Sequence, residues 1–220
     1  LSDRYGFVIA SDECYSEIYL DEARPPLGGM QAAAQLGRTD FRNLISFSSL
    51  SKRSNVPGMR SGFVAGDATL MAKFLLYRTY HGSALSPVVS AASIAAWQDE
   101  AHVIDNRKQY RAKFDAVLPI LEPVLNVTRP DASFYLWAGT KGSDSDFVRD
   151  LLTHTNVTTL PGSYVGRTVN GVNPGQNRIR IALVAPLAMR KSAPKLVLSC
   201  TVQKLTRPPR SEEHTSELQS

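Results

Sequence analysis

The chain has only two cysteines, Cys14 and Cys200, in 220 residues. Two cysteines cannot build the dense disulfide framework of small secreted proteins, so a reducing compartment is the default. No apolar run approaches the roughly 20 residues that a membrane-spanning helix needs. These shortages exclude a disulfide-stapled scaffold and a helical membrane protein, and we expect a cytoplasmic protein that has no membrane partner.

The chain also has little excess charge once its C-terminal end is set aside. The formal net charge is +5, but residues 189–220 contribute six Lys or Arg and three Asp or Glu, which leaves 19 basic and 17 acidic residues and a net charge of +2. This segment has no consistent helical period, and its end, "RSEEHTSELQS", resembles the conceptual translation of a sequencing adapter. We expect an out-of-frame, disordered tail, the alternative being a genuine basic tail. The remaining charge gives little reason for a nucleic-acid partner.

Strands and helices alternate in the first half of the sequence. Apolar runs at residues 7–11, 44–49 and 61–66 predict three buried parallel strands. Residues 67–80, capped by Asp67, and residues 86–98, with a proline at the first helical position, predict helices. This order predicts an α/β fold class with a mostly parallel sheet.

The pattern changes at residue 99. Residues 99–121 predict one long, charged, amphipathic helix, with apolar positions at Val103, Tyr110, Phe114 and Val117. Beyond it, strands at 125–128, 133–139, 157–160 and 177–183 and a helix at 144–155 predict a small α+β unit. We therefore expect half of a large domain over residues 1–98, an interdomain helix over 99–121 and a small C-terminal domain over 122–188.

Hydroxyl groups surround one lysine in the stretch "SFSSLSKRSNVPGMRSG", residues 46–62. Lys52 lies just after one predicted strand, and Asp12 lies at the end of another. In open α/β sheets, the C-terminal ends of strands line the ligand crevice. A lysine buried there loses its charge readily, and its neutral amine can form an imine with an aldehyde.

The neighbours of this lysine favour one particular aldehyde. Ser49 and Arg60 carry the hydroxyl and the planar guanidinium that bind a phosphate. Asp12 can stabilise a protonated ring nitrogen, and Tyr15, three residues later, can reach a ring oxygen. An aldehyde, a phosphate, a basic ring nitrogen and a phenolic oxygen together describe pyridoxal phosphate.

The compound pattern of "SDECYSEIY" followed by "SFSSLSKRSNVPGMRSGFVAG" resembles the class I and II aminotransferases of fold type I. The resemblance implies a role for each motif residue. Lys52 would hold the cofactor as an imine and move the proton, Asp12 would pair with the pyridine nitrogen, Tyr15 with the 3′ oxygen, and Ser49 and Arg60 with the phosphate. In "NRIRIAL", Arg180 would clamp the substrate α-carboxylate, and Arg178 is the weaker candidate.

Three further stretches, "LYRTYHGSALSPVVSAASIAAW", "PDASFYLW" and "LPGSYVGR", are similar to bacterial succinyldiaminopimelate aminotransferases. The resemblance covers roughly residues 1–188. It implies amino-group transfer between N-succinyl-LL-2,6-diaminopimelate and 2-oxoglutarate, in lysine biosynthesis, by a homodimer. Members of this family are about twice as long, so we expect a C-terminal fragment that is inactive alone.

Other interpretations remain open. The protein could be another class I or II transaminase, acting on aspartate, alanine or an aromatic amino acid, or a non-catalytic effector-binding domain of a regulator. Taken singly, Lys52 could be a surface lysine, Ser49 a helix cap and Cys14 a small buried apolar residue. Arg60 and Arg180 could form structural ion pairs. The joint order of the motifs favours the cofactor site, and nothing in it predicts a metal.

Overall fold

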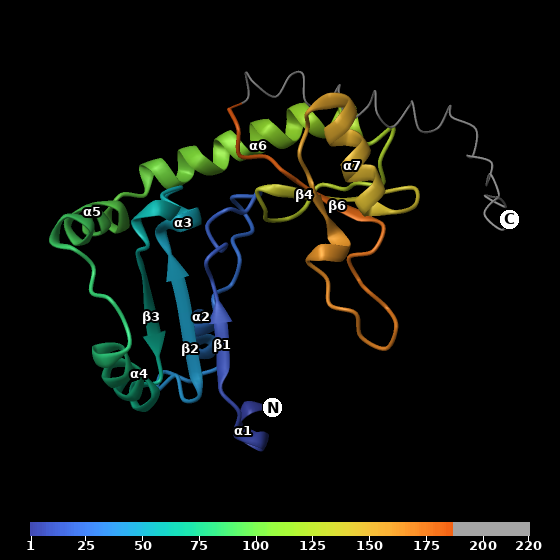
Figure 1. Cartoon of the computed structure of the whole chain (residues 1–220). Helices are drawn as coiled ribbons and strands as arrows, with labels where there is room; N and C mark the ends of the chain where they lie inside the picture. The colour runs from blue at the N-terminus through green and yellow to red at the C-terminus, as the bar shows by residue number, and fades with distance from the viewer. Residues whose placement is uncertain (187–220) are drawn as a thin grey trace, which may run out of the picture. The chain divides into compact units, whose positions relative to one another are not determined.

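The computed structural model describes residues 1–186, and packing divides them into two compact units (Figure 1). Unit 1 contains Leu1–Phe114 and Pro130–Phe134, and unit 2 contains Asp115–Arg129 and the described residues from Tyr135 onward. The expected tail at 189–220, with Cys200, lies outside the described residues. The domain limits expected at residues 98 and 122 stay a prediction.

Unit 1 is built on a three-stranded sheet in the order β1-β2-β3 (Figure 1). Its strands are β1 (Ile9–Asp12), β2 (Leu44–Ser49) and β3 (Gly62–Gly66). Strands β1 and β2 run parallel, with Asp12 opposite Phe47. Parallel strands end at the same edge of a sheet, so the C-terminal residues of β1 and β2 share one edge.

Strand β3 corrects the expectation of a third parallel strand, because it pairs antiparallel with β2. The connection between them contains only α3 (Leu50–Arg53) and the 3-10 turn η1 (Pro57–Met59). A parallel return needs a crossover that runs back along the whole sheet, and these two single turns are too short for that. The chain instead reverses at once, which places Lys52 and Arg60 in one connection beyond the end of β2.

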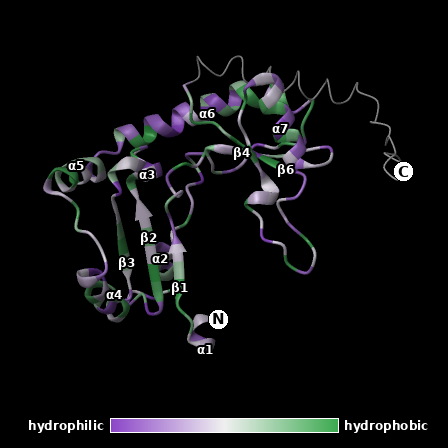
Figure 2. Cartoon of the chain, viewed as in Figure 1, coloured by the Kyte–Doolittle hydropathy of each residue, from purple (hydrophilic) through white to green (hydrophobic). Residues whose placement is uncertain are grey.

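The glycines of β3 fit close to β2. A Cβ at Gly62 would lie 2.4 Å from the carbonyl oxygen of Ser48, and one at Gly66, where φ is +146°, would lie 2.1 Å from that of Leu44. Figure 2 shows hydrophobic residues along all three strands. Most of the buried apolar side chains of unit 1 lie outside the strands: Ile18, Leu20, Leu50, Val103, Tyr110 and Phe114.

The helices of unit 1 largely match the expected ones. They are α1 (Ser2–Tyr5), α2 (Gly29–Gln35), α4 (Ala68–Tyr80), α5 (Pro87–Gln98) and the first part of α6 (Ala101–Leu121). The predicted Asp67 cap forms, because its side chain accepts from the amides of Thr69 and Leu70. Helix α5 begins with Pro87 as expected, and the Ser86 side chain caps it by accepting from the Val89 amide. The four apolar positions predicted in α6 are all buried.

Unit 2 has a three-stranded antiparallel sheet in the order β4-β6-β5. Its elements are β4 (Tyr135–Gly139), α7 (Asp144–Thr155), β5 (Leu160–Pro161), the 3-10 turn η2 (Gly162–Tyr164) and β6 (Arg178–Ala182). Its core includes Leu136, Ala138, Phe147, Leu151 and Ile179.

Two strand predictions in unit 2 need correction. Residues 125–128 form no strand, only an isolated bridge between Asn126 and Gly139, the last residue of β4. Strand β5 is only two residues long, and Pro161 lacks the N–H that a longer ladder needs. Within residues 1–186, no helix combines the length and the apolar character needed to cross a bilayer.

Candidate active site

Lys52 lies in the four-residue helix α3, directly after β2. Ser49 caps this helix by accepting a hydrogen bond from the amide of Ser51 at 3.1 Å. The expectation that Lys52 is buried is only partly correct, because the side chain is half-buried. In the same helix Leu50 and Arg53 are buried, so the Lys52 side chain lies on the more exposed side of α3.

Two aromatic rings lie next to the Lys52 amine. The Nζ atom is 4.7 Å from the ring centroid of Phe134 and 5.9 Å from that of Tyr15. These two rings stack on each other, with centroids 5.7 Å apart and an interplanar angle of 15°. The amine therefore has two aromatic π-faces beside it, which attract it as a cation.

Phe134 carries no predicted role, although it lies within the stretch "PDASFYLW". The segment Pro130–Phe134 returns to unit 1 and pairs with the loop after β1, because the Ser133 amide donates to the carbonyl of Ile18 and the Leu20 amide donates to that of Asp131. The only signal in the sequence was an aromatic residue near the start of the strand predicted over 133–139. That pattern is equally typical of a core residue.

Asp12 ends β1 with an exposed carboxylate. Its Oδ1 atom accepts a hydrogen bond from the Cys14 amide at 3.1 Å. Hydrogen bonds from the side chain and the backbone of Cys14 lower the pKa of Asp12, so the carboxylate is ionised at neutral pH. A permanent negative charge at this edge is what a protonated ring nitrogen requires as a partner.

Cys14 lies between Asp12 and Tyr15 in this loop. It is half-buried rather than fully buried. Burial, together with the hydrogen bond to Asp12, raises the pKa of the thiol to about 11. The protonated thiol is a poor nucleophile, which agrees with its interpretation as a packing residue.

Ser49 and Arg60 lie at the two ends of the α3–η1 connection. The Ser49 hydroxyl lies 3.2 Å from the carbonyl oxygen of Ser61, so the residue after Arg60 is held against the cap of α3. Arg60 is exposed, and its NH1 atom donates to the Pro57 carbonyl at 3.0 Å. Within residues 1–186 Arg60 has no ion pair, so the structural pair considered above does not form there.

Arg180 lies on β6 in unit 2, opposite Trp137 on one side and Leu160 on the other. Its guanidinium carbon is 5.5 Å from the ring centroid of Tyr135. Arg178, two residues earlier, lies on the same face of the strand and lines a polar cavity of about 250 Å³ that also includes Lys141. The two arginines therefore have different surroundings within unit 2.

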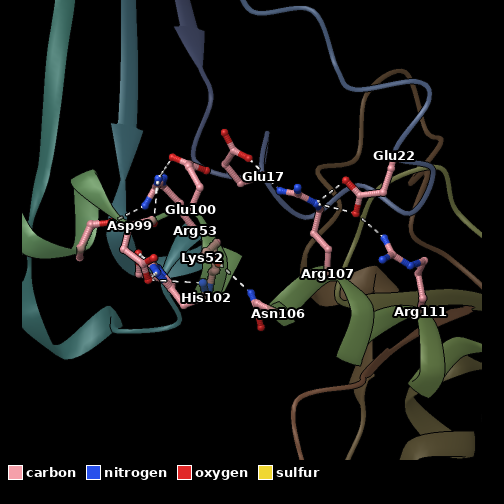
Figure 3. Close-up of polar contacts among 12 residues, drawn as sticks. Glu17, Glu22, Lys52, Arg53, Asp99, Glu100, His102, Asn106, Arg107 and Arg111 are labelled. Carbon is pink, nitrogen blue, oxygen red and sulfur yellow. Dashed lines mark hydrogen bonds and ion pairs between the residues drawn. The ribbon is translucent and has the colours of Figure 1, made fainter. Parts of the chain in front are cut away.

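The candidate residues of unit 1 come from one edge of the sheet, whereas Arg180 belongs to unit 2. Within residues 1–186, no group of His, Cys, Asp and Glu side chains could hold a metal ion. The polar residues of α6 near this edge, which Figure 3 displays, were not predicted from the sequence. Charged residues on a long helix are usually solvated, so their sequence gave no sign of burial.

Known proteins resemble this chain along most of its length. The family model for aminotransferase class I and II matches residues 1–193. An LL-diaminopimelate aminotransferase from Maridesulfovibrio salexigens is 32% identical over 194 residues, which cover 86% of this chain and 47% of that protein. The chain spans about half the length of the curated relatives that it matches.

Two solved structures extend this comparison. An aminotransferase from Neisseria meningitidis is 57% identical, with a TM-score of 0.84 over 90% of this chain and 50% of that one. The aminotransferase AspB from Helicobacter pylori is 30% identical, with a TM-score of 0.81 over 94% of this chain and 52% of that one. The match of the family model to residues 1–193 is decisive, and the chain belongs to the class I and II aminotransferases.

Proposed function

We propose that the chain is part of a pyridoxal-phosphate-dependent aminotransferase, which exchanges an amino group between an amino acid and a 2-oxo acid. The single observation that carries the proposal is the grouping of the Lys52 amine with the rings of Tyr15 and Phe134. This group lies beyond the sheet edge at which Asp12 and Ser49 end their strands.

The residues present fit this cofactor in their chemistry. Asp12 offers an ionised carboxylate for the pyridinium nitrogen, and Tyr15 offers a phenol for the ring oxygen. Ser49 and Arg60 offer a hydroxyl and a guanidinium for the phosphate. When bound, pyridoxal phosphate supplies a ring that accepts electrons from the substrate α-carbon.

The chain's own residues have three tasks in the proposed reaction. The Nζ atom of Lys52 would take the proton from the substrate α-carbon as a general base. As a general acid, it would then deliver this proton to the former aldehyde carbon of the bound cofactor. The ring of Phe134 fixes the direction of this amine and keeps water from one side of it. Arg180 binds the substrate α-carboxylate, since its planar fork can make two parallel charge-assisted bonds.

For the substrates, we propose N-succinyl-LL-2,6-diaminopimelate as the amino donor and 2-oxoglutarate as the acceptor, in a homodimeric enzyme of lysine biosynthesis. Unsuccinylated LL-diaminopimelate is the second candidate. It is supported by the names of several relatives, which are LL-diaminopimelate aminotransferases. Both donors present the same α-amino acid group, so the difference lies in how the far end of the donor is bound.

The test uses the protein that carries this chain. After incubation with pyridoxal phosphate and reduction with borohydride, peptide mapping should find the pyridoxyl group on Lys52, and Lys52→Ala should abolish transamination of either donor. Arg180→Lys should weaken the donor and the 2-oxo acid alike, by about tenfold or more, whereas Arg178→Lys serves as its control. A label on another lysine would refute the assignment of the site.

A further inference from the structure

Helix α6 contacts both loops of the candidate site with its first turns (Figure 3). On one side, the Nε2 atom of His102 is 2.8 Å from the Ser54 hydroxyl, and the side-chain Nδ2 of Asn106 donates to the Lys52 carbonyl at 3.5 Å. These contacts hold the segment that carries Lys52. On the other side, Arg107, which directly follows Asn106, and Arg111, about one turn later, point to the loop that follows β1.

Arg107 is the central residue of the second group. Its side chain is only 6% exposed. The Nε atom donates to both carboxylate oxygens of Glu22, at 3.0 and 3.2 Å, and NH1 donates to Glu17 at 3.1 Å. The guanidinium carbon also lies 4.3 Å from the ring centroid of Tyr19. One buried cation therefore binds three side chains of the same loop.

A buried cation with these partners fixes the loop firmly. The hydrogen bond from Arg107 is the main reason why the pKa of Glu22 falls to about 2. Removing one partner of a buried pair leaves the other charge without compensation, so loss of Arg107 is costly. Arg111 also donates to Glu22, at 2.6 Å, but its side chain is 27% exposed, so water can replace it.

The loop held by Arg107 carries one of the two rings beside Lys52 and pairs with the segment that carries the other. Glu17 follows Tyr15 by two residues, and the amide of the buried Ile18 donates to the Tyr15 carbonyl. The same loop pairs through Ile18 and Leu20 with the segment that ends at Phe134. A shift of the loop would therefore move both rings that lie beside the Lys52 amine.

We propose that Arg107 is a positioning residue of the site, which acts through Glu17 and Glu22 to hold Tyr15 and Phe134 against Lys52. The proposal rests on the proposed function in one respect, which is that the arrangement of these rings around Lys52 serves amino-group transfer. Arg107 contacts side chains of the loop itself, so its effect on the site is transmitted by the loop. This role belongs to a charged residue of the long helix that the sequence pattern marked only as amphipathic.

Cys14 provides a reporter that needs no cofactor, because it lies in this loop and its thiol has a pKa of about 11. In a Cys200→Ser background, we would measure the rate at which iodoacetamide labels Cys14 at fixed pH. Arg107→Gln should raise this rate by up to about 100-fold, because release of the loop returns the thiol toward its ordinary pKa of 9.0. The matched control Arg111→Gln should stay within about twofold of the parent.

A second control separates loop release from general destabilisation. Arg53 is another buried arginine, which binds Glu100 and the Ala96 carbonyl, away from the loop. Arg53→Gln should lower stability without raising the labelling rate. If Arg107→Gln does not fold, Glu17→Gln is the alternative variant, because it leaves the pair between Arg107 and Glu22 intact. It should still raise the labelling rate of Cys14 several-fold. Equal labelling in Arg107→Gln, Glu17→Gln and the parent would overturn the proposal.

The second readout is the pH titration of the bound cofactor's absorbance. If Arg107 positions Tyr15, Arg107→Gln should shift the midpoint by about one pH unit, and Arg111→Gln should not shift it. Faster labelling without such a shift would overturn the positioning role, because the loop would then be merely structural. If the parent protein binds no cofactor, the proposed function fails, while the labelling rates still decide whether Arg107 holds the loop.

Discussion

Arg60 has a backbone conformation that few residues other than glycine adopt, with a φ of 51°. An L side chain in the left-handed region costs about 1–2 kcal/mol, and such residues are often found at functional sites. Glycine would be unstrained at this position. The presence of an arginine therefore indicates that its guanidinium has a use there.

We predict that Arg60→Gly and Arg60→Ala differ in stability although both lose the guanidinium. The glycine variant should be about 1 kcal/mol more stable than the alanine variant, because it relieves the strain of a Cβ at positive φ. Both variants should bind pyridoxal phosphate about tenfold more weakly or worse. Urea unfolding and cofactor titration measure the two effects. An unchanged cofactor affinity would exclude Arg60 from the phosphate site.

At the residue scale, chemistry that depends on residue type and spacing could be anticipated, and chemistry that depends on distant packing could not. Lys52, Asp12 and Ser49 are found near strand ends because local pattern determines where strands end. Phe134 reaches the site only through long-range pairing of its segment with the loop after β1. Arg107 looks like any charged residue of an amphipathic helix until its burial is known.

At the scale of secondary-structure elements, one carboxylate joins three parts of unit 2. Asp144 begins α7, and it accepts hydrogen bonds from the Ser163 amide at 2.8 Å and the Asn177 amide at 3.4 Å. Burial opposes its ionisation, but the hydrogen bonds from Ser163 and Asn177 outweigh it and lower the pKa of Asp144 below its ordinary 3.8.

We predict that Asp144→Ala lowers the free energy of unfolding by about 1–3 kcal/mol at neutral pH. Because the folded-state pKa is depressed, this contribution is fully present above pH 3.8 and is lost as the pH falls through the folded-state value. The stability difference should therefore shrink in acid. Asp146→Ala, which removes an exposed first-turn carboxylate paired with Arg149, is the control and should have a small effect. A difference that grows in acid would contradict this account.

The helices were easier to anticipate than the connections. Asp67 and Ser86 are local caps, so the sequence marks where α4 and α5 begin. Helix α2 has no side-chain cap, and its Gly29 amide is bound by Glu13, 16 residues away, at 2.7 Å. The direction of β3 depends on whether a short connection can cross the sheet, which strand periodicity does not encode.

At the scale of the whole molecule, unit 1 exposes many apolar side chains. Figure 2 shows hydrophobic residues on α4 and α5. Leu75, Leu76 and Tyr80 on α4 are 69%, 62% and 77% exposed, and Val88 on α5 is 79% exposed. Apolar patches of this kind are typical of surfaces that associate with other surfaces.

We predict that the folded chain binds the dye ANS and self-associates as its concentration rises. Leu76→Gln should reduce both effects while leaving the thermal midpoint nearly unchanged, because the side chain is already exposed. The buried Leu44→Ala should instead lower stability by about 2–5 kcal/mol and increase dye binding. Dye fluorescence and sedimentation measure the two effects. Equal dye binding by the Leu76 variant and the parent would show that α4 does not form the patch.

The division of unit 1 along the chain affects how the protein can form during translation. Residues Pro130–Phe134 belong to unit 1, but the ribosome makes them only after Asp115–Arg129 of unit 2. The loop with Tyr15 and the helix with Lys52 therefore leave the exit tunnel before their shared neighbour Phe134 exists. At about 5–20 residues per second, they wait several seconds for it. A nascent chain that stops before residue 130 would present the lysine without the ring beside it.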